Sequence, residues 1–97
     1  MSGLEFLQDW YLAQTDGDWE HGFGITIETL DNPGWFVRVS LEETALEGRT
    51  FEYRAWEKSD DDWHHTWSDG VRFEGAGGPK NLSDLLREFR RFVESMS

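Results

Sequence analysis

The feature that most constrains the fold is a strand–turn–strand pattern in residues 23–41. Apolar residues alternate with polar or small ones from Phe23 to Glu28, which is the two-residue period of a half-buried strand. Asn32-Pro33-Gly34-Trp35 follows, and Pro then Gly at the centre of a turn is typical of a type II turn. The alternation then resumes and runs to Leu41. The sequence therefore predicts a β-hairpin over residues 23–41.

Further strands are indicated after the hairpin. Phe51, Tyr53 and Ala55 share one face of a third strand. An acidic loop at residues 59–62 precedes a fourth strand, and Asp69-Gly70 is a strong hairpin dipeptide that returns the chain into a fifth. Because these links have the length of hairpin connections, the strands should form an antiparallel sheet.

Helices are expected at both ends of the chain. Residues 4–14 carry a wide apolar face, and residues 82–96 carry an apolar stripe at helical spacing behind Asn81, a good N-cap. Both helices need an apolar surface to cover. The predicted fold is α+β, with an antiparallel sheet of about five strands flanked by an N-terminal and a C-terminal helix on one face. The 97 residues form a single domain, 1–97, whose core uses its six Trp, seven Phe and two Tyr.

Composition excludes several classes of function. The chain has no cysteine, which excludes a disulfide scaffold, a zinc ribbon and a thiolate nucleophile. Its formal charge of −11 repels nucleic acid and anionic membrane surfaces and attracts a basic partner. Ten acids and one base lie in residues 1–48, which gives that half −9. With no apolar run long enough to span a membrane and no secretory signal, we expect a cytoplasmic protein.

Metal binding and catalysis have weak support in the sequence. His64 and His65 are adjacent and point to opposite faces of a strand, so they do not readily share one ion. Asp60-Asp61-Asp62 lacks the ligand spacing of a calcium loop. Glu20-His21 could supply a base and a neighbouring acid, or could bond to backbone groups at a helix–strand junction. No nucleophile or phosphate-loop motif accompanies them, so we expect no metal, no cofactor and no enzymatic activity.

Two tryptophans stand beside acids. Trp19 lies between Asp18 and Glu20, and Trp63 follows Asp62. A Trp beside charge on an exposed loop is typical of an interface hot spot, although each ring could instead fold back over the core. Trp63 also shares a strand face with Trp67, and a pair of exposed, coplanar rings would suit a sugar or another small ligand.

Several motifs together resemble one known family. They are Leu7-Gln8-Asp9-Trp10-Tyr11, Asp16-Gly17-Asp18-Trp19-Glu20-His21, Gly24-Ile25, Glu28-Thr29-Leu30-Asp31-Asn32-Pro33-Gly34-Trp35, Asp62-Trp63 and Phe73-Glu74-Gly75-Ala76-Gly77. With the Leu-rich C-terminal helix, they resemble the immunity protein 53 family of bacterial polymorphic-toxin systems. The resemblance covers nearly the whole chain. It implies an antitoxin that binds and blocks a cognate toxin domain and has no enzymatic activity of its own.

Acidity and aromatic residues suit this role on independent grounds. A nuclease toxin needs a basic surface to hold phosphates, and an acidic inhibitor can occupy that groove. We therefore expect carboxylates to supply charge and tryptophans to act as anchors. The candidate contact residues are Asp16, Asp18, Trp19, Glu20, His21, Asp60, Asp61, Asp62 and Trp63.

Three other interpretations stay open at this point. The Gly-Asp-Trp-Glu-His block could be required for the fold, in which case Trp19→Ala would lower the melting temperature and not the affinity. A glycan or small-ligand module would present Trp63 and Trp67 as a flat, exposed pair. A small enzyme would bring Glu20 and His21 together in a deep pocket.

Overall fold

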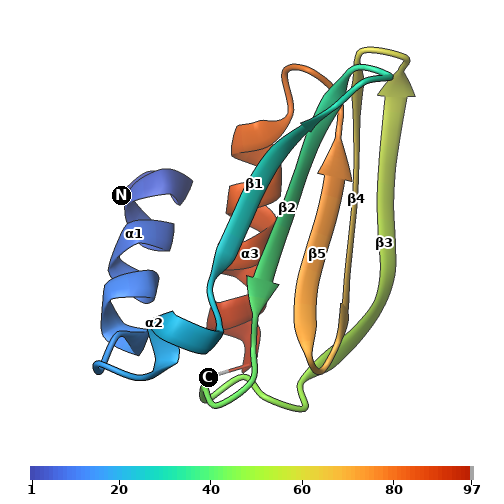
Figure 1. Ribbon diagram of the computed structural model, residues 1–97. Coiled ribbons are helices and arrows are strands. Elements are labelled where there is room, and N and C mark those ends of the chain that lie inside the picture. The colour runs from blue at the N-terminus through green and yellow to red at the C-terminus, as the bar shows by residue number, and fades with distance from the viewer. Residues whose placement is uncertain (97) are drawn as a thin grey trace.

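Helices lie on one face of an antiparallel sheet in the computed structural model, which describes residues 1–96 (Figure 1). The elements in chain order are α1 (Gly3–Gln14), α2 (Trp19–Gly22), β1 (Ile25–Leu30), β2 (Gly34–Ser40), β3 (Thr50–Ser59), β4 (Asp62–Asp69), β5 (Arg72–Gly77) and α3 (Leu82–Met96). The predicted α+β fold is confirmed. The short helix α2 was not expected, and the first strand begins two residues later than Phe23 because α2 occupies the chain up to Gly22.

The sheet has the order β1-β2-β5-β4-β3, and each neighbouring pair is antiparallel. A β1–β2 hairpin therefore stands beside a β3–β4–β5 meander, and β5 joins the two by pairing with β2. The segment between β2 and β3 crosses one end of the sheet, and β1 and β3 form its two edges (Figure 1). Helix α3 covers the middle strands, and α1 packs along α3 on the same side.

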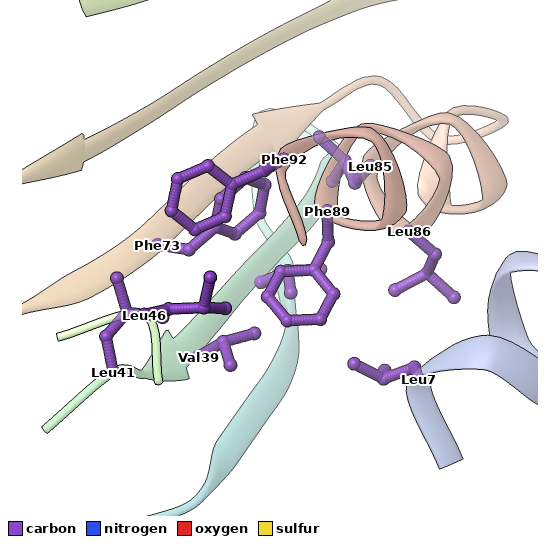
Figure 2. Close-up of a cluster of buried hydrophobic side chains, with 10 residues drawn as sticks. Leu7, Val39, Leu41, Leu46, Phe73, Leu85, Leu86, Phe89 and Phe92 are labelled. Atoms are coloured by element: carbon purple, nitrogen blue, oxygen red, sulfur yellow. The ribbon is translucent and has the colours of Figure 1, made fainter. Parts of the chain in front are cut away.

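The core lies between the sheet and α3. Val37 and Val39 of β2 and Phe73 of β5 are fully buried, because alternate residues of each strand face the helix. The ring of Phe73 meets that of Phe89 edge-on at 5.1 Å between centroids. Figure 2 shows these side chains with the other buried members of the cluster, which are Leu7, Leu41, Leu46, Leu85, Leu86 and Phe92. The predicted apolar stripe of the C-terminal helix is thus confirmed.

The β1–β2 turn differs from the prediction. Gly34 is already the first residue of β2 and does not have the positive φ that the second central residue of a type II turn requires, and the Asn32–Pro33 peptide bond is cis. Glycine is required there for a different reason. A Cβ at Gly34 would lie 2.3 Å from the carbonyl oxygen of Gly77 on the paired strand β5. The close approach of two backbones therefore excludes any side chain at this position.

Candidate functional site

The predicted contact residues fall into two groups at opposite ends of the molecule. Residues 16–21 lie around α2, at the lower end in Figure 1, and residues 60–63 lie around the β3–β4 turn at the upper end. The molecule is 41 Å long in its longest direction. Because the two groups lie at the two ends of the sheet, they do not form one continuous acidic surface.

Two carboxylates of the lower end bond to their own backbone. Asp16 Oδ1 accepts hydrogen bonds from the backbone N–H groups of Asp18 and Trp19, both at 2.9 Å. The Glu20 carboxylate accepts from the N–H groups of Asp16 and Gly17, both at 3.0 Å. The N–H of Trp19, followed by that of Asp18, lowers the pKa of Asp16 below its usual value. These two acids therefore fix the conformation of the α1–α2 connection.

Trp19 is a core residue, and the expectation that it is an exposed anchor is wrong. Its side chain is 3% exposed, and its ring packs against those of Trp10, Tyr11 and Phe23. Trp19 is the first residue of α2, and its ring lies against two rings of α1 and that of Phe23, so that a large aromatic surface leaves water. The alternative, in which the ring folds back over the core, is therefore correct for Trp19.

Asp18 and His21 of the lower end remain exposed. Glu20 and His21 do not form the convergent pair that an enzyme would need, because the Glu20 carboxylate is bonded to the backbone of the preceding turn. Within residues 1–96, no cluster of three or more His, Cys, Asp or Glu side chains could hold a metal ion.

The upper end is an acidic turn between β3 and β4 that is hydrogen-bonded to Asn81. Asp60 and Asp61 are exposed, and Asp62 is half-buried at the start of β4. The Asn81 amide group donates to Asp62 Oδ1 at 3.0 Å and to Asp84 Oδ2 at 2.7 Å. Its carbonyl oxygen accepts the backbone N–H of Trp63 at 3.2 Å.

Asn81 therefore has a different role from the one predicted. It does precede the first residue of α3, as an N-cap residue should. Its side-chain oxygen, however, bonds to the N–H of Trp63 in β4. Asn81 is 2% exposed, so each of these bonds forms away from water and fixes the β4 end of the turn to the start of α3.

Trp63 borders a hollow at the upper end. The hollow has a volume of about 640 Å³, and its lining residues are Asn32, Glu57, Lys58, Ser59, Asp60 and Trp63. Trp63 is half-buried, so part of its ring is available to a partner. The β1–β2 turn and the β3–β4 turn thus meet around one tryptophan. We call this site the upper hollow.

The helices leave one face of the sheet open (Figure 1). A row of rings lies on this face, formed by Tyr53, Trp63, His65 and Trp67. His65 lies at its centre: Nε2 is 2.7 Å from Glu57 Oε1, and Nδ1 bonds to the Tyr53 hydroxyl. The Tyr53 ring in turn stacks on that of Trp67. Sequence reasoning missed this Glu–His–Tyr chain, because residues 53, 57 and 65 meet only through the β3–β4 register.

Trp63 and Trp67, the pair proposed for a glycan or small-ligand site, are both half-buried. Trp63 and Trp67 do share the face, as their spacing predicted. Trp67, however, stacks on Tyr53 at 5.8 Å between centroids, and Trp63 meets His65 at an interplanar angle of 57°. Each of the two tryptophan rings therefore packs against a neighbouring ring on this face.

Comparisons with known proteins identify the family. No helix among residues 1–96 has the length and apolar character needed to cross a membrane. No curated protein and no solved structure matches the chain at a significant level. The model of the family described as immunity protein 53 matches residues 4–94 of the 97 residues. The match spans α1 through most of α3, and the chain therefore belongs to the immunity protein 53 family.

Proposed function

We propose that this immunity protein binds a cognate toxin domain through its upper end and neutralises it by covering a basic, nuclease-like surface. The observation that carries the proposal is the exposed acidic pair Asp60–Asp61 beside a half-buried tryptophan, Trp63, on a turn fixed by Asn81. Tryptophan is enriched in interface hot spots, and polar or charged residues usually form the rim around such an anchor.

The lower end is also acidic, but its residues serve a different purpose. Asp16 and Glu20 cap the local backbone, and Trp19 is buried. Their charges add to the field of the whole molecule, and this field accelerates the approach of a basic partner over several ångströms of solvent. Asp18 and His21 are available for contact there, but the tryptophan beside them in the chain, Trp19, is buried.

Neutralisation by this surface needs no catalytic step. A nuclease holds its substrate by pairing Lys and Arg with phosphates, so carboxylates placed on those cations exclude the nucleic acid. The upper turn suits this purpose because it is already ordered in the free protein. Asn81 holds both Asp62 and the Trp63 backbone, which lowers the entropy lost on binding.

The test compares charge reversal at the two ends. The variant Asp60→Lys/Asp61→Lys changes the charge of the upper end. Glu43 is exposed in the segment between β2 and β3, which lies at the lower end (Figure 1), so Asp18→Lys/Glu43→Lys changes the charge of the lower end by the same amount. We expect the upper variant to lower the association rate constant with the toxin domain encoded beside this gene by about tenfold or more and to flatten its salt dependence. The lower variant should have a clearly smaller effect. Equal effects, or a larger one at the lower end, would remove the upper turn from the interface.

A further inference from the structure

The two edges of the sheet are built differently. The edge strand β3 carries four charged residues, and its pairing with β4 has two register irregularities. Charges and bulges of this kind prevent an edge from pairing with another chain. The opposite edge, β1, contains one charged residue, Glu28, and pairs with β2 in an uninterrupted register from Ile25 to Leu30. The edge formed by β1 is therefore the one left open to pairing.

The free backbone groups of β1 can be assigned from its register. The N–H of Ser40 donates to the carbonyl of Gly24 at 3.0 Å, immediately before the strand. Hydrogen-bonded positions alternate along an antiparallel ladder, so Thr26 and Glu28 bond to β2. The N–H and C=O groups of Ile25, Ile27 and Thr29 then point away from the sheet, where a further strand could bond to them.

An apolar groove runs along the same edge. It has a volume of about 450 Å³ and lies between α1 and β1, and its apolar lining includes Leu4, Leu7, Tyr11, Phe23, Ile25 and Ile27. Helix α1 rests on α3, through contacts such as Phe6 with Phe89, and so leaves this side of β1 uncovered. Leu4 is 54% exposed and Ile27 is 40% exposed. Such apolar walls beside a free edge indicate a binding groove.

We propose that an extended segment of the toxin domain completes the sheet at β1, a step that rests on the proposed function. The segment bonds to the outward backbone groups of Ile25, Ile27 and Thr29. Its alternate side chains are apolar and enter the groove beside α1. The remaining side chains lie next to Thr26 and Glu28 on the open face, where a Lys or Arg meets the Glu28 carboxylate.

Charge and position favour the toxin over a second copy of this chain. Two copies would bring together molecules that each carry −11, whereas a basic partner is attracted. The β1–β2 turn, with Asp31 and Asn32, joins the end of β1 to the upper hollow. A partner paired with β1 can therefore reach Asp60 and Trp63 without crossing the helical layer.

The first arm of the test is amide hydrogen exchange followed by NMR, for the free chain and for its complex with the toxin domain encoded beside this gene. The N–H groups of Ile25, Ile27 and Thr29 face solvent in the free protein and should exchange at least about tenfold more slowly in the complex. The N–H of Ala55, which points outward from the β3 edge by the same alternation, should be unchanged.

The second arm uses a matched pair of proline variants. Thr29→Pro removes a backbone N–H that points outward from β1, and Ala55→Pro removes the equivalent N–H from β3. Neither substitution removes a hydrogen bond between strands of the sheet. Circular dichroism and thermal unfolding establish that both variants fold. Thr29→Pro should weaken toxin binding by about tenfold, and Ala55→Pro should leave it within about twofold. If Thr29→Pro does not fold, Ile27→Asp, which places a carboxylate in the groove, replaces it with the same expected loss.

The outcomes separate the two proposals. If the toxin domain binds but the three β1 amides stay unprotected and Thr29→Pro binds normally, the strand-pairing inference is wrong and the proposed function stands. If the wild-type chain does not bind, the proposed function fails, and the inference fails with it. If the same amides become protected in the free chain as its concentration rises, the occupant of β1 is a second copy and the assignment to the toxin is overturned.

Discussion

The indole Nε1–H of Trp19 donates to the backbone carbonyl of Glu42 at 2.9 Å. This bond joins α2 to the segment between β2 and β3. The two bonded residues are 23 positions apart in the chain. The Trp19 ring packs against the rings of Trp10, Tyr11 and Phe23. Trp19 thus holds the lower end of the molecule together, in a position from which it cannot contact a partner.

Trp19 variants should lose stability and keep affinity. Trp19→Ala should lower the free energy of unfolding by about 3–5 kcal/mol, and Trp19→Phe, which mainly removes the bond to Glu42, by ~1–2 kcal/mol. Urea unfolding measures both. Trp56→Ala is the matched control, because Trp56 is 45% exposed and its loss should cost under ~1 kcal/mol. Reduced toxin affinity in a Trp19 variant of unchanged stability would restore this ring to the interface.

A second prediction concerns Gly34, at the start of β2, and Gly24, immediately before β1. Gly34→Ala should lower the free energy of unfolding by ~2–3 kcal/mol, because its Cβ would lie 2.3 Å from the backbone oxygen of Gly77. Gly24→Ala is the control, since no atom lies within 4 Å of the added Cβ. Thermal unfolding of the two variants measures the difference. Equal melting temperatures would show that β2 and β5 can separate to admit a methyl group.

Asn81 should prove important for the upper turn. Asn81→Ala leaves the backbone N–H of Trp63 and the carboxylates of Asp62 and Asp84 without their buried partner. We expect the free energy of unfolding to fall by ~1–3 kcal/mol. In hydrogen exchange, the N–H of Trp63 should lose protection, while that of Phe73 in the core should not. Retained protection at Trp63 would contradict the role given to Asn81.

The stability of the lower end should depend on pH in a defined direction. Backbone N–H groups lower the pKa of Asp16 from its ordinary value of 3.8, so folding favours its charged form. The stabilisation is therefore present above the pKa of the unfolded state and is lost as the pH falls through the lower pKa of the folded state. Asp16→Asn should be less stable than the wild type at neutral pH, and the difference should shrink below about pH 4.

Asp18→Asn is the control for this prediction, because the Asp18 side chain makes no capping hydrogen bond. At neutral pH, denaturant unfolding should therefore show a smaller loss of stability for Asp18→Asn than for Asp16→Asn. A difference between Asp16→Asn and the wild type that grows as the pH falls would contradict the assignment.

Local patterns predicted the elements well. Strict alternation around Asn32–Gly34 predicted the hairpin, and the stripe from Leu85 to Phe92 predicted a helix that covers the sheet. Both follow from periodicity, which is a property of neighbouring residues. Helix α2 is a single turn, too short to show any periodicity, and it was missed.

The candidate site depended on contacts between distant residues, and these were harder to predict. Asp16 and Asp60 are both acids in loops, and the sequence does not show that one loop lies at each end of the sheet. The burial of Trp19 depends on the partner loop at Glu42, and the Glu57–His65 pair depends on strand register. In the same way, the open edge at β1 became visible once the strand order was known.

Neutralisation of a basic toxin through an acidic surface can be measured by a binding titration of this chain against the toxin domain encoded beside its gene, at low and at high salt. We predict nanomolar binding at low salt that weakens by at least about tenfold at high salt, because exposed carboxylates face a basic surface. Tight binding that is independent of salt would keep the immunity role and contradict its electrostatic basis. Absence of binding at both salt concentrations would contradict the proposed neutralisation of this toxin.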